Sequence, residues 1–165
     1  MVYILDAYNV LHKMRRFGPA LDQNLRAARE ALVNACTALM QARGDVTSVI
    51  LVFDGRSEFR DLPQNAPPGI QLVFSETGED ADDRITLVLE ELPKKSQKCV
   101  VSDDNSVRNH ARAYGVRSIS VAEFERLLQA GENKGRIKSG LPEKFSLPSN
   151  LADDITREYK KKLGL

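Results

Sequence analysis

The chain of 165 residues contains no tryptophan, two histidines and two cysteines. Cys36 and Cys99 stand in apolar surroundings and form no CxxC pair or zinc spacing, so neither a thiolate metal site nor a disulfide scaffold is indicated. We expect both to be buried free thiols in a reducing compartment. His12 and His110 show no ligand spacing and have no nucleophile partner, so the pattern assigns them no catalytic role.

Long apolar runs are also missing. No run approaches the roughly 20 residues that a membrane-spanning helix needs. The first five residues lead directly into a strand-like pattern, without the basic segment of a signal peptide. The composition, 42% hydrophobic and 28% charged, is that of an ordinary globular protein. We therefore expect a cytoplasmic protein with no membrane partner and one compact domain.

Charge is unevenly distributed, although the formal net charge is only +1. Residues 131–165 contain eight Lys or Arg against five Asp or Glu, a balance of +3, and residues 1–130 have a balance of −2. A basic tail on a slightly acidic body is compatible with a polyanionic partner. An ordinary solvated, lysine-rich helix end explains the same pattern equally well.

Short apolar runs alternate with helix-period segments along residues 1–130. The strand-like runs are 2–5, 48–53, 70–74, 98–102 and 116–120, and the helical patterns are 21–44, 79–92, 104–115 and 120–131. This alternation predicts a three-layer α/β/α domain with a mostly parallel central sheet. Beyond residue 131 the periodicity stops, so we expect a C-terminal tail that is extended and then forms one short helix over 151–163.

Three of the predicted strands end in aspartate. Asp6 ends the first strand, Asp54 ends the second, and Asp103 and Asp104 follow the fourth. In an open parallel sheet, ligands bind outside the carboxyl ends of the strands, so these acids should share one edge.

The helix after the third strand brings Asp80, Asp82 and Asp83 to the same edge. At about 100° per residue, Asp82 falls roughly 65° from the centre of the apolar stripe of this helix, whereas Asp83 and Asp80 fall about 165° and 135° away. We expect Asp82 at the margin of the sheet and the other two facing water.

Clustered carboxylates repel each other, and a divalent cation removes that cost. Oxygen ligands without a histidine or cysteine partner suit Mg²⁺ or Mn²⁺ rather than zinc. The strand ends and the helix geometry predict a metal site at Asp6, Asp54, Asp82 and Asp103. The alternative is that some of these acids cap helices, and it applies best to Asp80 and Asp104.

Small polar groups support this edge. Asn9 follows Asp6 in the loop that leaves the strand, where its amide could orient a metal-bound water or a phosphate. Ser102 could bond to Asp103 or to a helix N–H. Simple capping is the alternative for both residues, and Asp104 is a further supporting group.

Basic residues follow the acids in the sequence. Lys13, Arg56, Arg84 and Arg108 could surround the acidic centre and bind a phosphate backbone, although surface arginines are common on helices. Tyr8 could stack on a base or pack against the first helix.

The motifs LDAYNVL, VFDG, GEDADDRI and VVSDDNSVR, in this order, resemble the NYN domain family, in particular its bacterial YacP-like branch with a PIN-like nuclease fold. The resemblance covers roughly residues 1–130. It implies a metal-dependent ribonuclease in which Asp6, Asp82 and Asp103 form the central metal-binding and catalytic set, with Asp54 and Asn9 supporting. Many PIN relatives carry a glutamate on an early helix, and we do not transfer that role to Glu30.

The leading hypothesis is a Mg²⁺- or Mn²⁺-dependent endoribonuclease. Its expected partner is messenger, transfer or ribosomal RNA, either free or on the ribosome. The alternative is a non-catalytic adaptor that binds RNA or a ribonucleoprotein. A phosphatase of the HAD type is set aside, because it needs an aspartate two residues after the first and Tyr8 occupies that position.

Overall fold

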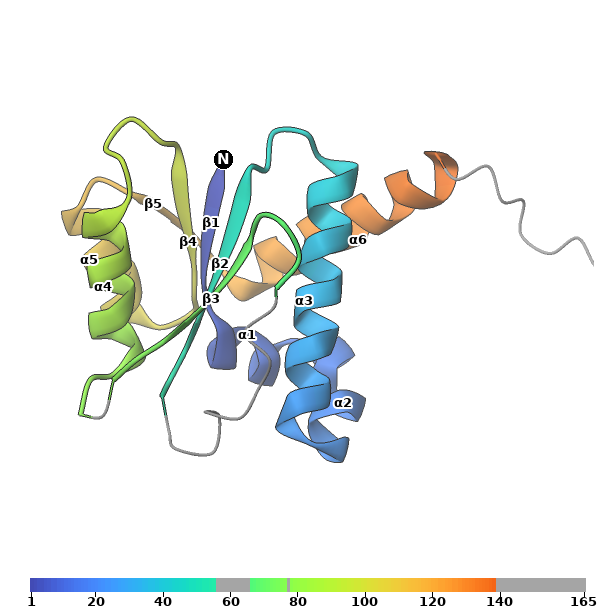
Figure 1. Ribbon diagram of the computed structural model, residues 1–165, viewed down its shortest axis with the longest axis horizontal. Coiled ribbons are helices and arrows are strands. Elements are labelled where there is room, and N and C mark those ends of the chain that lie inside the picture. The colour runs from blue at the N-terminus through green and yellow to red at the C-terminus, as the bar shows by residue number, and fades with distance from the viewer. Residues whose placement is uncertain (56–65, 77, 139–165) are drawn as a thin grey trace, which may run out of the picture. The chain divides into compact units, whose positions relative to one another are not determined.

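The computed structural model describes residues 1–55, 66–76 and 78–138 (Figure 1). The strands are β1 (Val2–Asp6), β2 (Ser48–Phe53), β3 (Ile70–Phe74), β4 (Lys98–Val101) and β5 (Arg117–Ile119). The helices are α1 (Ala7–Lys13), the 3₁₀ turn η1 (Arg15–Phe17), α2 (Gly18–Gln23), α3 (Leu25–Ala42), α4 (Ala81–Glu91), α5 (Asn105–Ala113) and α6 (Val121–Lys138).

The five strands form one parallel sheet in the order β3-β2-β1-β4-β5. Helices α4 and α5 cover one face of the sheet, and α3 and α6 lie on the other (Figure 1). Successive strand side chains point to opposite faces, so each face has its own core. One core contains Leu5, Leu32 and Phe124, and the other contains Ile4 and Ile85. The predicted three-layer architecture with a parallel sheet is confirmed.

Two predictions of secondary structure near the N-terminus were wrong. The pattern over 21–44 forms two helices, because the extended backbone of Asn24 interrupts it and the Asn24 side chain caps α3 by accepting the N–H of Ala27 at 2.8 Å. The segment after Asp6, expected as a loop, is helix α1, and Asp6 is its N-cap.

Helix α6 does not end at Gly131 but continues to Lys138, so residues 132–138, expected to be extended, are helical. Gly131 is needed there for close packing rather than for ending the helix. A Cβ atom at this position would lie 3.3 Å from the side chain of Leu39 and 3.4 Å from its Cα. The glycine therefore allows α6 to approach α3 closely.

Several smaller predictions are confirmed. Ser120 and Glu123 form the expected capping box, with the Glu123 N–H bonded to the Ser120 hydroxyl at 3.2 Å and the Ser120 N–H bonded to the Glu123 carboxylate at 2.8 Å. Cys36 and Cys99 are buried and free. Within the described residues, no helix has the length and apolar character required to cross a membrane.

Candidate active site

Asp6 ends β1 with its side chain 9% exposed. One carboxylate oxygen accepts the backbone N–H of Asn9 at 3.5 Å, and the other accepts the hydroxyl of Ser102 at 3.2 Å. Burial raises the pKa of Asp6, and the charges of Asp82 and Asp104 raise it further, against the effect of the two hydrogen bonds. Asp6 is therefore a buried acid whose negative charge is poorly compensated by the protein alone.

Ser102 connects the ends of two strands. Leu5 of β1 pairs with Val101 of β4, so the next residues, Asp6 and Ser102, reach the sheet edge at the same level. The fully buried Ser102 hydroxyl donates to Asp6 and accepts the N–H of Asp104 at 3.0 Å. Neither of the two expected alternatives is found: Ser102 bonds to Asp6 rather than to the Asp103 carboxylate, and the N–H that it accepts belongs to Asp104, the N-cap residue just before α5.

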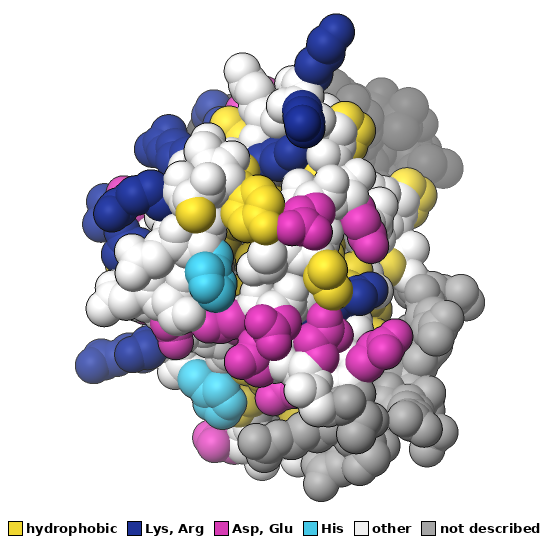
Figure 2. Space-filling view, turned by 90° about the vertical axis from the view of Figure 1, so that its left-hand side faces the viewer, with side chains coloured by type: hydrophobic (Ala, Val, Ile, Leu, Met, Phe, Trp, Pro, Cys, Tyr) yellow, Lys and Arg dark blue, Asp and Glu magenta, His cyan; other side chains and the backbone are white. Residues whose placement is uncertain are grey.

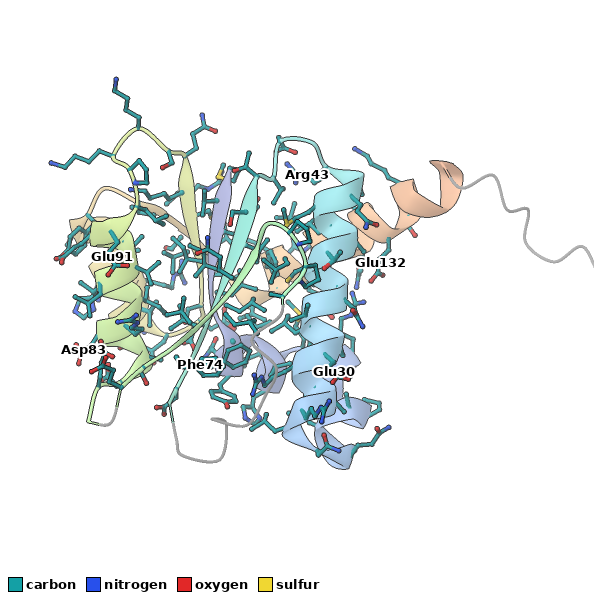
Figure 3. All side chains as sticks on the ribbon, viewed as in Figure 1. Glu30, Arg43, Phe74, Asp83, Glu91 and Glu132 are labelled. Carbon is teal, nitrogen blue, oxygen red and sulfur yellow. The ribbon has the colours of Figure 1, made fainter. Side chains whose placement is uncertain are left out.

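Asp82 lies half-buried in the first turn of α4. Burial raises its pKa, the charges of Asp104 and Asp80 add to this effect, and a hydrogen bond with Ser106 opposes it. Asp80 caps α4 by accepting the N–H of Asp83 at 2.8 Å, and both residues are exposed. Figure 3 shows Asp83 at the start of α4. The orientation predicted from helix geometry is therefore correct for all three acids.

Asp103 and Asp104 follow β4 but have different surroundings. The Asp103 carboxylate accepts the N–H of Val121 at 2.9 Å, and the Asp103 N–H donates to the side-chain oxygen of Asn9 at 3.0 Å. Asp104 caps α5 by accepting the N–H of Ser106 at 2.7 Å, and its charge raises the pKa of both Asp6 and Asp82. The charge of Asp104 is therefore part of the acidic surroundings of Asp6 and Asp82.

Asp54 binds the end of the neighbouring strand β3. Its carboxylate accepts the hydroxyl of Ser75 at 3.3 Å, and the same hydroxyl accepts the N–H of Gly55 at 2.8 Å. A Cβ atom on Gly55 would lie 1.7 Å from the Ser75 carbonyl oxygen, so only glycine allows this approach. The VFDG motif thus connects the carboxyl ends of β2 and β3.

The predicted RNA-binding residues occupy varied positions. Lys13 is exposed at the end of α1, while Arg84 and Arg108 are half-buried on α4 and α5. Arg56 lies outside the described residues. Tyr8 packs edge-on against Phe53 with ring centroids 5.5 Å apart.

Sequence reasoning missed Ser106 and His110, the two groups on α5 that favour the ionised form of Asp82. Their i, i+4 spacing places both on one face of the helix, and this spacing was the available signal.

It also missed Arg29, which is 5% exposed on α3. Its guanidinium lies 4.9 Å from the ring centroid of Phe53 and 5.1 Å from that of Phe74. The helical apolar pattern of α3 gave no sign that this arginine is buried.

Figure 2 shows the face of the molecule covered by α4 and α5. Acidic side chains gather there in one band, with the two histidines on either side of it. This face therefore carries an acidic band, the kind of surface that attracts a cation.

The donor chemistry of this edge fits a hard divalent cation, because the acids offer only oxygen ligands. In residues 1–55, 66–76 and 78–138, however, no three His, Cys, Asp or Glu side chains are grouped closely enough to bind one ion together. Mg²⁺ commonly takes one or two carboxylates and completes its coordination with water and substrate phosphates. Asp6 and Asp82 are compatible with that mode of binding.

Comparisons with known proteins agree with this architecture. The model of the YacP-like NYN domain matches residues 3–164, so the similarity extends through the tail, beyond the 1–130 expected from the motifs. A crystal structure of Rae1 (YacP) from Bacillus subtilis superimposes with a TM-score of 0.67 and 19% identity, covering 98% of this chain and 93% of that chain. A mutant of the same protein gives a TM-score of 0.66 and 20% identity, with 85% of each chain covered. No curated protein sequence matches the chain.

Proposed function

The chain belongs to the YacP-like NYN domain family, and we propose that it is a Mg²⁺- or Mn²⁺-dependent endoribonuclease that hydrolyses phosphodiester bonds in RNA. The observation that carries this proposal is the environment of Asp6. It is a buried acid whose pKa is raised by burial and by the charges of Asp82 and Asp104. Such a group is stabilised in its ionised form by a bound cation.

Asp6 and Asp82 would hold the ion. A divalent cation supplies activation of water and stabilises the oxygens of an in-line phosphodiester displacement. The remaining roles belong to the chain itself. Ser102 holds the Asp6 carboxylate in place through its hydroxyl. Asn9 fixes the start of the segment after β4 by accepting the Asp103 N–H.

The third acid is either Asp103, as the motif resemblance implies, or Asp104. Two observations favour Asp104. Its charge raises the pKa of Asp6 and of Asp82, and its backbone N–H donates to the Ser102 hydroxyl. We propose that Asp103 and Asp54, at the same edge of the sheet, help to hold a second ion or an ordered water.

The proposed partner is cytoplasmic RNA of the messenger, transfer or ribosomal class, free or on the ribosome. Lys13, Arg84 and Arg108, with Arg56 and Tyr8, are the proposed contacts around the acids. In the proposed domain division, residues 1–130 form the nuclease domain and the basic tail, 131–165, adds affinity for RNA through its charge.

One observation favours the alternative of a non-catalytic RNA-binding adaptor. The described residues offer no ready group of three metal ligands. An adaptor would bind RNA tightly and Mn²⁺ weakly, and a nuclease would bind both.

A matched pair of variants in α4 tests the nuclease. Asp82→Asn and Asp83→Asn each remove one negative charge from the same helical turn, but only Asp82 is half-buried near Asp104. We expect Asp82→Asn to weaken calorimetric Mn²⁺ binding and RNA cleavage about tenfold or more, with Asp83→Asn close to the wild type. Equal behaviour of the two variants would reject the assignment.

A further inference from the structure

A concave surface lies at the opposite end of the sheet from the acids. It is a groove of about 800 Å³ formed where α4 and α5 end and where β4 and β5 begin. Its polar lining includes Lys94, Lys98, Arg117, Tyr114 and Glu90. We call this surface the basic groove.

The positive charge of the basic groove is available to a ligand. Lys94 and Arg117 are exposed, and neither takes part in an ion pair found among the described residues. Lys98 donates to the carbonyl oxygen of Leu92 at 3.2 Å and so keeps its ammonium group at the end of α4. Figure 2 shows basic side chains projecting at the end of this face that lies away from the acidic band.

The acid in the groove is already bonded to a neighbour. The carboxylate of Glu90 accepts a short hydrogen bond from the hydroxyl of Tyr114. This bond anchors an aromatic side chain that is 45% exposed, one of two large hydrophobic residues exposed in the described part of the chain. A ring held at the surface beside two cations has the chemistry of a nucleotide site, since the ring stacks on a base and the cations bind phosphates.

We propose that the basic groove binds a segment of single-stranded RNA that flanks the cleaved bond. This inference rests on the proposed nuclease function. Met1, which directly precedes β1, lines the groove, and Asp6 ends β1 five residues later, so the two sites lie about 17 Å apart along the direction of β1. The groove therefore contacts a distant part of the RNA and acts on affinity, while the acids act on the chemical step.

The test compares two charge-reversal pairs in the full chain carrying Asp6→Asn to prevent cleavage. Lys94→Glu with Arg117→Glu alters the groove, and Arg26→Glu with Arg126→Glu, the control pair, makes the same charge change on exposed positions of α3 and α6 outside the basic tail. The probe is a labelled single-stranded RNA long enough to span β1, measured by fluorescence anisotropy at several salt concentrations.

We expect the groove pair to weaken binding of the long RNA about tenfold or more and to reduce the salt slope by about 1.4, the contribution of two phosphate contacts to single-stranded RNA. Tyr114→Ala should weaken binding about tenfold through lost stacking. An RNA too short to span β1 should not distinguish the groove pair from the control pair.

Equal affinities and salt slopes for the groove pair and the control pair on the long RNA would overturn the inference. The inference would also be overturned if adenosine monophosphate bound in the groove while the groove pair had no effect on RNA binding. RNA cleavage is measured separately with the chain that keeps Asp6. A failure of the groove to bind RNA and a failure of the chain to cleave RNA therefore give different results. A groove variant that cleaves short RNA at the wild-type kcat and long RNA with a higher KM supports the groove.

Discussion

The carboxylate of Asp103 accepts the backbone N–H of Val121 at 2.9 Å and so holds the first turn of α6 against the end of β4. The next residue, Asp104, interacts instead with the other acids, because its charge raises the pKa of Asp6 and of Asp82. These two consecutive acids therefore have different surroundings, and in the proposed function Asp104 contributes more to the acidic edge than Asp103 does.

Substitution by asparagine separates these roles, because asparagine can still accept the capping hydrogen bonds. We expect Asp104→Asn to reduce RNA cleavage about tenfold or more, with a smaller loss in Asp103→Asn. Single-turnover cleavage with saturating Mg²⁺ measures the difference. A larger loss in Asp103→Asn than in Asp104→Asn would instead support the set implied by the sequence motifs.

Metal-free stability should depend on pH through Asp6. Its pKa is raised in the folded state, so between the unfolded and folded pKa values the folded protein binds more protons, and stability falls as pH rises through this window. Asp6→Asn should remove this fall and make the chelated protein more stable at neutral pH. Urea unfolding with chelator across acidic and neutral pH measures it. Parallel pH profiles for the two proteins would contradict the environment assigned to Asp6.

Ser102→Ala should destabilise the protein, because it removes a buried donor to Asp6 and the acceptor of the Asp104 N–H. The expected loss in free energy of unfolding is about 1–3 kcal/mol. Ser118→Ala, at a half-buried serine of β5, is the control. Chemical denaturation measures both, and equal small losses would show that the Ser102 bonds contribute little.

Gly55→Ala should also destabilise the fold. The added Cβ would lie 1.7 Å from the Ser75 carbonyl oxygen, so the ends of β2 and β3 must move apart. We expect a loss of about 1–3 kcal/mol in the free energy of unfolding. Gly44→Ala adds the same atom where nothing lies within 4 Å, and it should stay close to the wild type. A Gly55 variant as stable as the Gly44 variant would contradict the close approach.

The parts of the site that follow a regular period could be predicted from sequence. The parallel sheet followed from alternating apolar runs, and the inward position of Asp82 followed from the 3.6-residue period of α4. The sequence analysis placed Asp103 in the metal set and Asp104 among the capping and supporting groups, and this assignment stays a prediction, because a turn after a strand sets each side chain individually. The predicted helix end at Gly131 was wrong for a related reason. This glycine packs tightly against Leu39 in the middle of α6, a tertiary contact that the sequence does not show.

The rate of RNA cleavage by Asp6→Asn in saturating Mg²⁺ tests the central claim most directly. Asp6 is the acid on which the proposed metal site depends, and asparagine keeps its size and its ability to accept the Asn9 N–H. The account predicts a loss of at least about a hundredfold, since the cation supplies several kcal/mol of transition-state stabilisation, with folding retained in circular dichroism. Cleavage at the wild-type rate would contradict the account.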